Sequence, residues 1–527
     1  MPLPVLSRRQ ALLGSLSAAI LTPSMTMRAY GAPESPFALG VASGDPASDG
    51  FVIWTRIAPS PLAPDGLGGM SAPAQVKWTV WHDEALTQPA LSGVVLTHPD
   101  SAHSVHIEVT GLKADRFYWY RFEALGVQSP VGRARTLPVE THAATALKLV
   151  VASCSHYELG YFSAYRHMAN ENPDLVLFLG DYIYEYSYSD TSKIVRQHDA
   201  PGEISDLAGY RNRYALYHMD ADLQALHACT SCLMTWDDHE VQNDYGAALS
   251  QYMKYDAGMV ALRRAAYQAY YENMPLRRTS RLIGTHLQLY KGYRFGTLAE
   301  INMLDGRQYR SPAACAVGDS RKGHVVDETC TDRLDPRRTM LGFEQEAWLF
   351  KRFQKSQAKW NILGQDLLAA SLLQSGKNKD GQAIIGHWTD GWDGYPATRD
   401  RLLLAMQAAR LKNPVILSGD IHSFWANELK ADSRDPQSAT IATEFVGTSI
   451  TANSPPYKTF ADLLPQNPHV KYFNSRTHGY MAVEVTPQAL NTRFMAISDR
   501  RDPNATISNE ISFAVETAKA AIHPIAT

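Results

Sequence analysis

Between residues 35 and about 140, short runs of alternating apolar and polar residues are separated by turn signals. Four such runs, at 51–56, 76–81, 106–109 and 117–122, have the alternation typical of half-buried strands. Turn dipeptides such as Asp45-Pro46 and Asp65-Gly66 separate the strands. Many short strands over about 100 residues predict an all-β, immunoglobulin- or fibronectin-like sandwich at residues 35–140.

From residue 147 onward, continuous apolar runs of strand length alternate with longer, more polar segments. The runs lie at 147–152, 174–179, 233–236, 298–304, 360–363 and 414–417. Such runs are typical of strands buried on both faces. The interleaved segments 160–170, 252–273, 344–357 and 398–412 are helical candidates, and the tail at 509–522 is predicted as a short helix. The pattern predicts an α/β domain at residues 146–527, joined to the sandwich by a linker at 137–145.

The first 32 residues have the pattern of an export signal. Arg8-Arg9 precede a short apolar stretch that ends near residue 21, and small residues follow at 29–32. This order is typical of a cleaved signal peptide, and the paired arginines favour twin-arginine export machinery. Ala11 stands where that motif prefers Phe or Leu, and a membrane anchor, for which the apolar stretch is short, is the alternative. We expect a periplasmic or secreted protein.

The overall charge gives no support to a nucleic-acid partner. The 527 residues have a formal net charge of −3, and the basic residues form no long run. A hydrophobic content of 45% is ordinary for a globular protein. The length is sufficient for two domains.

Five cysteines, an odd number, leave one thiol without a partner inside an exported chain. Cys315 and Cys330 flank a polar, loop-like stretch and are the best candidates for a disulfide. Cys229 and Cys232 fit a redox pair, half a zinc site or two ordinary structural cysteines, and the sequence leaves these alternatives open. Cys154 then stands alone, directly after the first apolar run of the α/β region.

Nearly every buried strand of the α/β region is followed by a short segment that is rich in potential metal ligands. These segments are Ser-Cys-Ser-His at 153–156, Gly-Asp-Tyr-Ile-Tyr at 180–184, Asp-Asp-His-Glu at 237–240, Asp-Gly-Arg at 305–307 and Gly-Asp-Ile-His at 419–422. In open α/β sheets, ligands bind beyond the carboxyl ends of the strands. A single Gly-Asp pair after a strand is usually part of a turn, and a single pair of adjacent acids is usually part of a solvated loop. Repetition at several strand ends instead predicts a site for two or more cations.

Together these motifs resemble the metallophosphoesterases, and more closely the alkaline phosphatase D (PhoD-like) family. The resemblance extends from Gly-Val-Ala-Ser-Gly-Asp-Pro at 40–46 to the Asp-Ile-His segment. It rests on Cys-Ser after the first strand, Gly-Asp-x-x-Tyr, Trp-Asp-Asp-His-Glu and Ser-Gly-Asp-x-His. It implies metallophosphoesterase-type layered β-sheets flanked by helices. It also implies a tyrosine-bound ferric ion (Fe3+) paired with calcium (Ca2+).

Carried over to this chain, the resemblance implies two sets of metal ligands. The ferric ion would be surrounded by Cys154, Asp181, Tyr184 and His422. Asp181 would bridge to calcium, whose further oxygen ligands would be Asp238 and Asp420, with Asp237 or Asn243 as additional candidates. The superfamily pattern has Asp-x-His after the first strand and Gly-His-x-His at the last site. The Cys154 and Asp420 departures argue against a histidine-rich di-zinc or di-manganese centre.

The expected reaction is attack of a metal-activated water on a phosphate ester, without a covalent serine intermediate. His239 would contact the phosphate or protonate the leaving group, or instead orient a neighbouring group. Arg307 and Arg310 would hold phosphate oxygens, or form surface salt bridges. The expected substrates are small phosphate monoesters and also diesters. The alternatives are a phosphodiesterase or phospholipase D-like enzyme with phospholipid substrates, and a binding protein without turnover.

Overall fold

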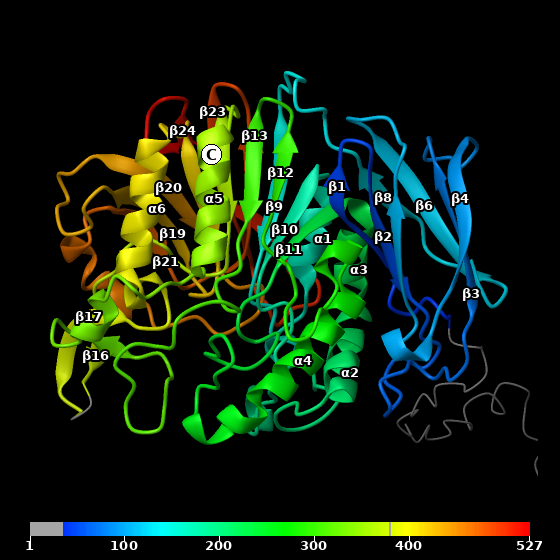
Figure 1. The fold of residues 1–527 in the computed structure, drawn as a ribbon, viewed down its shortest axis with the longest axis horizontal. Coiled ribbons are helices and arrows are strands. Elements are labelled where there is room, and N and C mark those ends of the chain that lie inside the picture. The colour runs from blue at the N-terminus through cyan, green and yellow to red at the C-terminus, as the bar shows by residue number, and fades with distance from the viewer. Residues whose placement is uncertain (1–34, 379–380, 527) are drawn as a thin grey trace, which may run out of the picture. The chain divides into compact units, whose positions relative to one another are not determined.

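The computed structural model describes residues 35–378 and 381–526, so the predicted signal at 1–32 lies outside the described residues. These residues form one ten-stranded, one seven-stranded, one five-stranded and one three-stranded sheet (Figure 1). The helices of this part of the chain are all too short or too polar to span a membrane.

The ten-stranded sheet has a parallel centre of β9 (Leu147–Ala152), β10 (Leu175–Leu179) and β11 (Ser231–Thr235). Beside β9 it continues through antiparallel strands, namely β22 (His478–Val485), β23 (Ala489–Ile497), β24 (Ile507–Glu516) and β25 (His523–Ile525). Beside β11 it continues through β1 (Val41–Ala47), β2 (Gly50–Arg56) and β5 (Ser104–Val109).

The seven-stranded sheet has four parallel strands, β13 (Ala299–Met303), β15 (Trp360–Gly364), β18 (Pro414–Ser418) and β20 (Thr440–Val446). Its antiparallel strands are β12 (Lys291–Phe295), β19 (Phe424–Lys430) and β21 (Val470–Asn474). A separate three-stranded sheet contains β14 (Val325–Val326), β16 (Gln374–Lys377) and β17 (Ala383–Trp388).

The two large sheets pack face to face, and helices cover their outer faces. Along β9, Leu149 and Val151 belong to the core between the sheets, whereas Val150 belongs to the core beneath the helices. The helices over the ten-stranded sheet are α1 (Ser163–Asn170), α2 (Leu207–His218), α3 (Ala221–Cys229) and α4 (Asp256–Asn273). Those over the seven-stranded sheet are α5 (Phe343–Lys355) and α6 (Pro396–Ala408); the short α7 is Lys458–Ala461. Burial on both faces explains the continuous apolar runs.

The N-terminal strands form two packed sheets. The five-stranded sheet contains β3 (Gln75–Trp81), β4 (Pro89–Leu96), β6 (Phe117–Ala124), β7 (Val127–Gln128) and β8 (Gly132–Arg135). Its Val76 and Tyr120 share a core with Phe51 and Ile53 of β2. Strand β1 also pairs in parallel with β11, so sheet pairing crosses the division predicted near residue 140. That division stays a prediction.

The predicted helix at 509–522 is wrong, because residues 507–516 form strand β24. Ile511, Phe513 and Val515 recur at every second position and face the core between the two large sheets. Period-two burial is the signature of a strand, and pairing with β23 completes its backbone hydrogen bonds. The predicted helical segments at 160–170, 252–273, 344–357 and 398–412 overlap α1, α4, α5 and α6.

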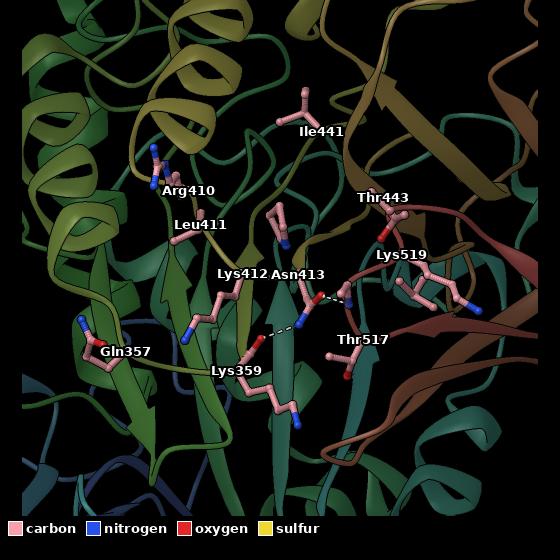
Figure 2. Close-up of a pocket in the computed structure, with 14 residues that line it drawn as sticks. Gln357, Lys359, Arg410, Leu411, Lys412, Asn413, Ile441, Thr443, Thr517 and Lys519 are labelled. Carbon is pink, nitrogen blue, oxygen red and sulfur yellow. Dashed lines mark hydrogen bonds between the residues drawn. The ribbon is translucent and has the colours of Figure 1, made fainter.

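The parallel strands give the molecule two chemically distinct edges. The polar segments after β9, β10, β11 and β18 lie at the carboxyl edge, as expected for parallel strands. At the amino edge of the seven-stranded sheet, a pocket of about 640 Å³ is lined by Lys359, Lys412 and Asn413 among other residues (Figure 2).

Candidate metal centre

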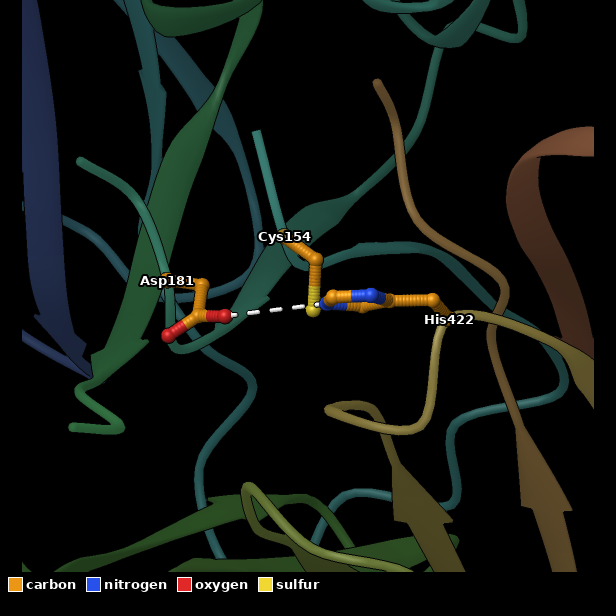
Figure 3. Close-up of side chains that lie close together, drawn as sticks. All are labelled: Cys154, Asp181 and His422. Carbon is orange, nitrogen blue, oxygen red and sulfur yellow. Dashed lines mark ion pairs between the residues drawn. The ribbon is translucent and has the colours of Figure 1, made fainter. Parts of the chain in front are cut away.

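Three of the four residues predicted around the ferric ion converge into one cluster, and the fourth lies against it. Potential ligand atoms of Cys154, Asp181 and His422 all lie within 4.8 Å of one another (Figure 3). The Tyr184 hydroxyl donates a hydrogen bond to Asp181 Oδ2 at 2.7 Å and lies 3.3 Å from His422 Nε2. Thiol, carboxylate, phenol and imidazole groups from three loops therefore surround one point.

The loops that carry these groups adopt an unusual backbone conformation. Positive φ angles occur at Cys154 (62°), Asp181 (52°), Asp420 (64°) and His422 (54°). A non-glycine residue in this region costs on the order of 1–3 kcal/mol, and such residues cluster at functional sites. Two backbone hydrogen bonds tie the first two loops together, from Cys154 N to Gly180 O at 3.2 Å and from Ser155 N to Asp181 O at 2.9 Å.

His422 presents the ring nitrogen that a metal requires. Its Nδ1 lies 2.7 Å from the carbonyl oxygen of Asn453. Because a carbonyl only accepts, we assign the proton to Nδ1, which leaves the Nε2 lone pair facing the cluster. Burial lowers the pKa of His422 to about 4, so the ring is neutral at pH 7.

The carboxylates of this region are buried and crowded, and one oxygen of Asp181 has no partner in the described part of the chain. Asp181 Oδ1 is buried and has no hydrogen-bond donor among the described residues. Burial raises the pKa of Asp181 well above its ordinary value, and the charges of Asp238 and Asp237 raise it further. Burial and the charge of Asp237 act on Asp420 in the same direction. Buried, crowded carboxylates are costly unless a cation neutralises them, so the residues present fit a metal centre.

Two further acidic clusters adjoin the first and open into a pocket of about 650 Å³. Potential ligand atoms of Asp181, Asp238 and His239 lie within 4.8 Å of one another. Asp420 lines the same pocket as Asp181 and Asp238. The three carboxylates predicted to hold calcium therefore face a common space.

The third cluster contains two carboxylates that the sequence pattern did not predict. Asp244 and Asp390 join Asp238 in a group whose ligand atoms lie within 4.8 Å of one another. Asp238 Oδ2 accepts a hydrogen bond from Asp244 N at 2.6 Å. Asp244 could have been suspected, because it follows the Asp-Asp-His-Glu motif by four residues, but Asp390 follows no predicted strand. This cluster could hold a further cation.

Asn243 lines the pocket, but both of its nitrogen atoms are engaged elsewhere. Its backbone N donates to Glu185 Oε1 at 2.8 Å, and its side-chain Nδ2 donates to Gln251 Oε1 at 3.1 Å. Its predicted place beside calcium stays a prediction.

Arg307 is fully buried behind the acidic clusters. It donates hydrogen bonds to Asp237 and, at 2.8 Å, to Asp390 Oδ2, and it lies 3.8 Å from Asp238 Oδ2. Arg310 also donates to Asp390. Neither arginine is among the residues that line the pocket. In this structure both balance part of the acidic charge, and their predicted contact with phosphate stays a prediction.

Comparison with known proteins identifies the family. A family model described as PhoD-like phosphatase matches residues 149–494, and one for the PhoD-like phosphatase N-terminal domain matches residues 24–138. The chain belongs to the PhoD-like phosphatase family. Alkaline phosphatase D of Bacillus subtilis is 42% identical over 484 residues, which cover 91% of this chain and 80% of that protein. A solved structure described as PhoD has 39% identity and a TM-score of 0.87, over 94% of this chain and 93% of the other.

In this PhoD-like phosphatase, His239 lies at the mouth of the metal centre. Its Nδ1 lies 2.7 Å from Glu185 Oε2, and its ring centroid lies 4.2 Å from that of Tyr184. Burial opposes a charge on His239, but the negative charges of Glu185, Asp238 and Asp181 outweigh burial and raise its pKa well above the ordinary value. These charges therefore favour the protonated ring of His239 when no cation is bound.

Glu240 shapes the PhoD-like site through the backbone. Its carboxylate accepts hydrogen bonds from the N–H groups of Tyr182 (2.6 Å), Asp237 (2.9 Å) and Asp181 (3.2 Å). These bonds join the loop after β10 to the loop after β11. One buried acid thus fixes the spacing of two ligand-bearing loops.

The predicted disulfide is confirmed between Cys315 and Cys330, whose Cα atoms lie 6.0 Å apart. Within its loop, Gly323 N donates to Asp244 Oδ2 at 2.9 Å, which connects the disulfide loop to the third acidic cluster. Cys229 and Cys232 are free thiols, and Cys232 Sγ lies 3.6 Å from His227 Nδ1.

Proposed function

We propose that this PhoD-like phosphatase is an exported enzyme that hydrolyses phosphate monoesters, and also phosphodiesters, at a metal centre. The observation that carries the proposal is the convergence of Cys154, Asp181, Tyr184 and His422 beside a buried acidic cluster whose charge Arg307 and Arg310 balance only in part. The similarity to alkaline phosphatase D supports phosphate esters as the substrate class.

The donor set supports different metals in the two halves of the site. A thiolate and a phenolate suit a highly charged Fe3+ held by Cys154, Asp181, Tyr184 and His422. The oxygen-only donors of Asp181, Asp238 and Asp420 suit Ca2+. When bound, such cations polarise the phosphoryl oxygens and an attacking water.

The residues of the chain supply the remaining functions. His239, which Glu185 holds at the pocket, would donate a proton to the leaving oxygen. Leu372, Trp388 and Phe460 form part of the pocket wall and give the leaving group apolar surface. A pocket of about 650 Å³ has room for a second ester arm, which supports diesters alongside monoesters.

The proposed periplasmic or secreted location is supported by the Arg8-Arg9 motif and the apolar stretch after it. Cell fractionation of the native chain and of an Arg8→Lys/Arg9→Lys variant tests this. Export of the native chain alone is expected, and equal export of both would contradict the twin-arginine route.

Elemental analysis and hydrolysis of p-nitrophenyl phosphate and bis-p-nitrophenyl phosphate, on one sample, test the activity. We expect iron and calcium in the protein and turnover of both esters.

His239→Asn should keep the metals while kcat falls by about 100-fold or more, because a positioned proton donor is lost. His286→Asn, an exposed position outside the pocket, is the matched control. If iron- and calcium-loaded protein hydrolysed neither ester, the proposal would be wrong.

A further inference from the structure

A second polar pocket lies at the amino edge of the seven-stranded sheet. Its volume is about 640 Å³, and its walls come from the segments before β15 and β18, from β20 and from the chain after β24. The metal centre lies beyond the carboxyl ends of the parallel strands. A five-residue strand spans about 16 Å, so the sheet itself separates the two pockets.

The lining of this pocket is strongly one-sided in charge. Four of its fourteen lining residues are cationic, namely Lys359, Arg410, Lys412 and Lys519, and none is acidic. Lys519 is paired with Glu516, whereas the other three form no ion pair with any acid in the described part of the chain. A concave surface lined by one sign of charge focuses its field on a ligand of the opposite sign.

The floor of the pocket is fixed by one side chain. Asn413 Nδ2 donates to Lys359 O at 2.8 Å, and Asn413 Oδ1 accepts from Ala518 N at 2.7 Å. These two bonds join three segments that are far apart in the sequence. Figure 2 shows Lys412, Lys359 and Lys519 arranged around this central Asn413. The three lysines therefore surround a braced floor, with their ammonium groups directed outward from Asn413.

An unsatisfied hydroxyl adds an independent observation. Thr443 of β20 is 1% exposed, and its Oγ1 has no hydrogen-bond partner among the described residues. Figure 2 shows this oxygen directed toward the side of the pocket where Asn413 lies. A buried hydroxyl without a partner is unfavourable, so its retention here points to a ligand that completes the bond.

We propose that this pocket binds a multiply charged phosphate anion, separately from the metal centre. Ammonium and guanidinium groups form charge-assisted hydrogen bonds with phosphate oxygens, and the Thr443 hydroxyl donates one more. Cationic groups spread around a space of about 640 Å³ suit a chain of two or three phosphoryl groups better than a single one. No residue of the metal centre takes part.

Calorimetric titration of the full, metal-loaded protein with tripolyphosphate tests the proposal. We expect a binding event that remains when the metal centre is saturated with inorganic phosphate. Lys359→Gln/Lys412→Gln should weaken this event at least 10-fold and leave turnover of a small monoester unchanged. Lys77→Gln/Lys113→Gln, which removes the same charge from exposed positions elsewhere, is the matched control and should leave binding unchanged.

Thr443→Val separates a ligand-binding role from a structural one. Because the hydroxyl has no protein partner, the variant should melt at the same or a higher temperature, yet bind tripolyphosphate several-fold more weakly. The proposal fails if both lysine pairs weaken binding equally, or if Thr443→Val leaves binding unchanged. It also fails if citrate binds as tightly as tripolyphosphate, because the pocket would then select charge rather than phosphate.

Discussion

At the scale of single residues, the metal centre depends on side chains held in conformations that a free loop would avoid. The positive φ angles at Cys154 and Asp181 are stabilised by the backbone bonds that link their loops. Burial raises the pKa of the Cys154 thiol, and the negative charge of Asp181 raises it further. The thiolate therefore needs a nearby cation to form.

Cys154→Ala should abolish iron binding and activity together, because it removes the soft donor of the cluster. We expect less than about one-hundredth of the native kcat/KM, since removal even of groups that only support a metal ligand costs up to about 100-fold. Metal analysis and ester hydrolysis give the readouts. Cys229→Ala, another free cysteine, serves as the control. A Cys154→Ala protein with native iron content and native rate would refute the assignment.

Tyr184→Phe should remove any visible absorption band that arises from a phenolate bound to iron. The hydroxyl that contacts Asp181 and His422 is lost, while the ring remains. Visible spectra of iron-loaded protein provide the measurement. Tyr186→Phe, a neighbouring ring in the same aromatic group, should leave the spectrum unchanged. An unaltered band in the Tyr184 variant would place the chromophore on another residue.

At the scale of elements, the ends of the parallel strands bring the ligands together. The apolar runs predicted β9, β10, β11, β13, β15 and β18 to within a few residues. Strands buried on both faces have continuous apolar sequences, so these runs could be assigned as strands from the sequence. The segment at 509–522 was mispredicted because its period-two pattern, Ile511, Phe513 and Val515, becomes decisive only when β23 is beside it. The local preference of this segment for a helix is weaker than the stabilisation gained by its pairing with β23.

Removal of the disulfide should destabilise the protein without removing the metals. Cys315→Ser/Cys330→Ser opens a loop with a sequence separation of 15, for which the chain-entropy model gives about 3 kcal/mol in the free energy of unfolding. Urea unfolding provides the measurement, with Cys229→Ser as the matched control. Because the bond from Gly323 joins this loop to Asp244 of the third acidic cluster rather than to a predicted iron ligand, the iron content should be unchanged. Equal stability of variant and native protein would contradict the prediction.

At the scale of the whole molecule, buried acids around one centre make the metal-free protein sensitive to pH. Burial raises the pKa of Glu240 from 4.5 to about 7, and burial with the charge of Asp390 raises that of Asp244 from 3.8 to about 7. The folded state therefore binds more protons than the unfolded state between these values. Stability falls as the pH rises through such a window.

Chelator-treated protein should consequently lose, between pH 5 and pH 7, the stability that protonated Glu240 contributes, and a Glu240→Gln variant isolates this contribution. Buried neutral histidines act in the opposite direction, because burial lowers the pKa of His227 and His478 to about 3 while their unfolded forms take up a proton below about pH 6.5. Thermal melts of both proteins at several pH values provide the measurement, because the histidine contribution is the same in each. The melting temperature of the native protein should fall relative to that of Glu240→Gln as the pH rises from 5 to 8. An unchanged difference between the two melting temperatures over this range would contradict this account.

The sequence by itself determined the family resemblance, the main buried strands and the identity of most candidate ligands. These features are local, because a strand buried on both faces and a ligand directly after it are encoded within a few residues. The tertiary structure alone decided that Asp390 joins Asp238 and Asp244, that Arg307 is buried against acids, and that residues 507–516 pair as a strand. Each depends on contacts between segments far apart in the chain, which no local pattern encodes.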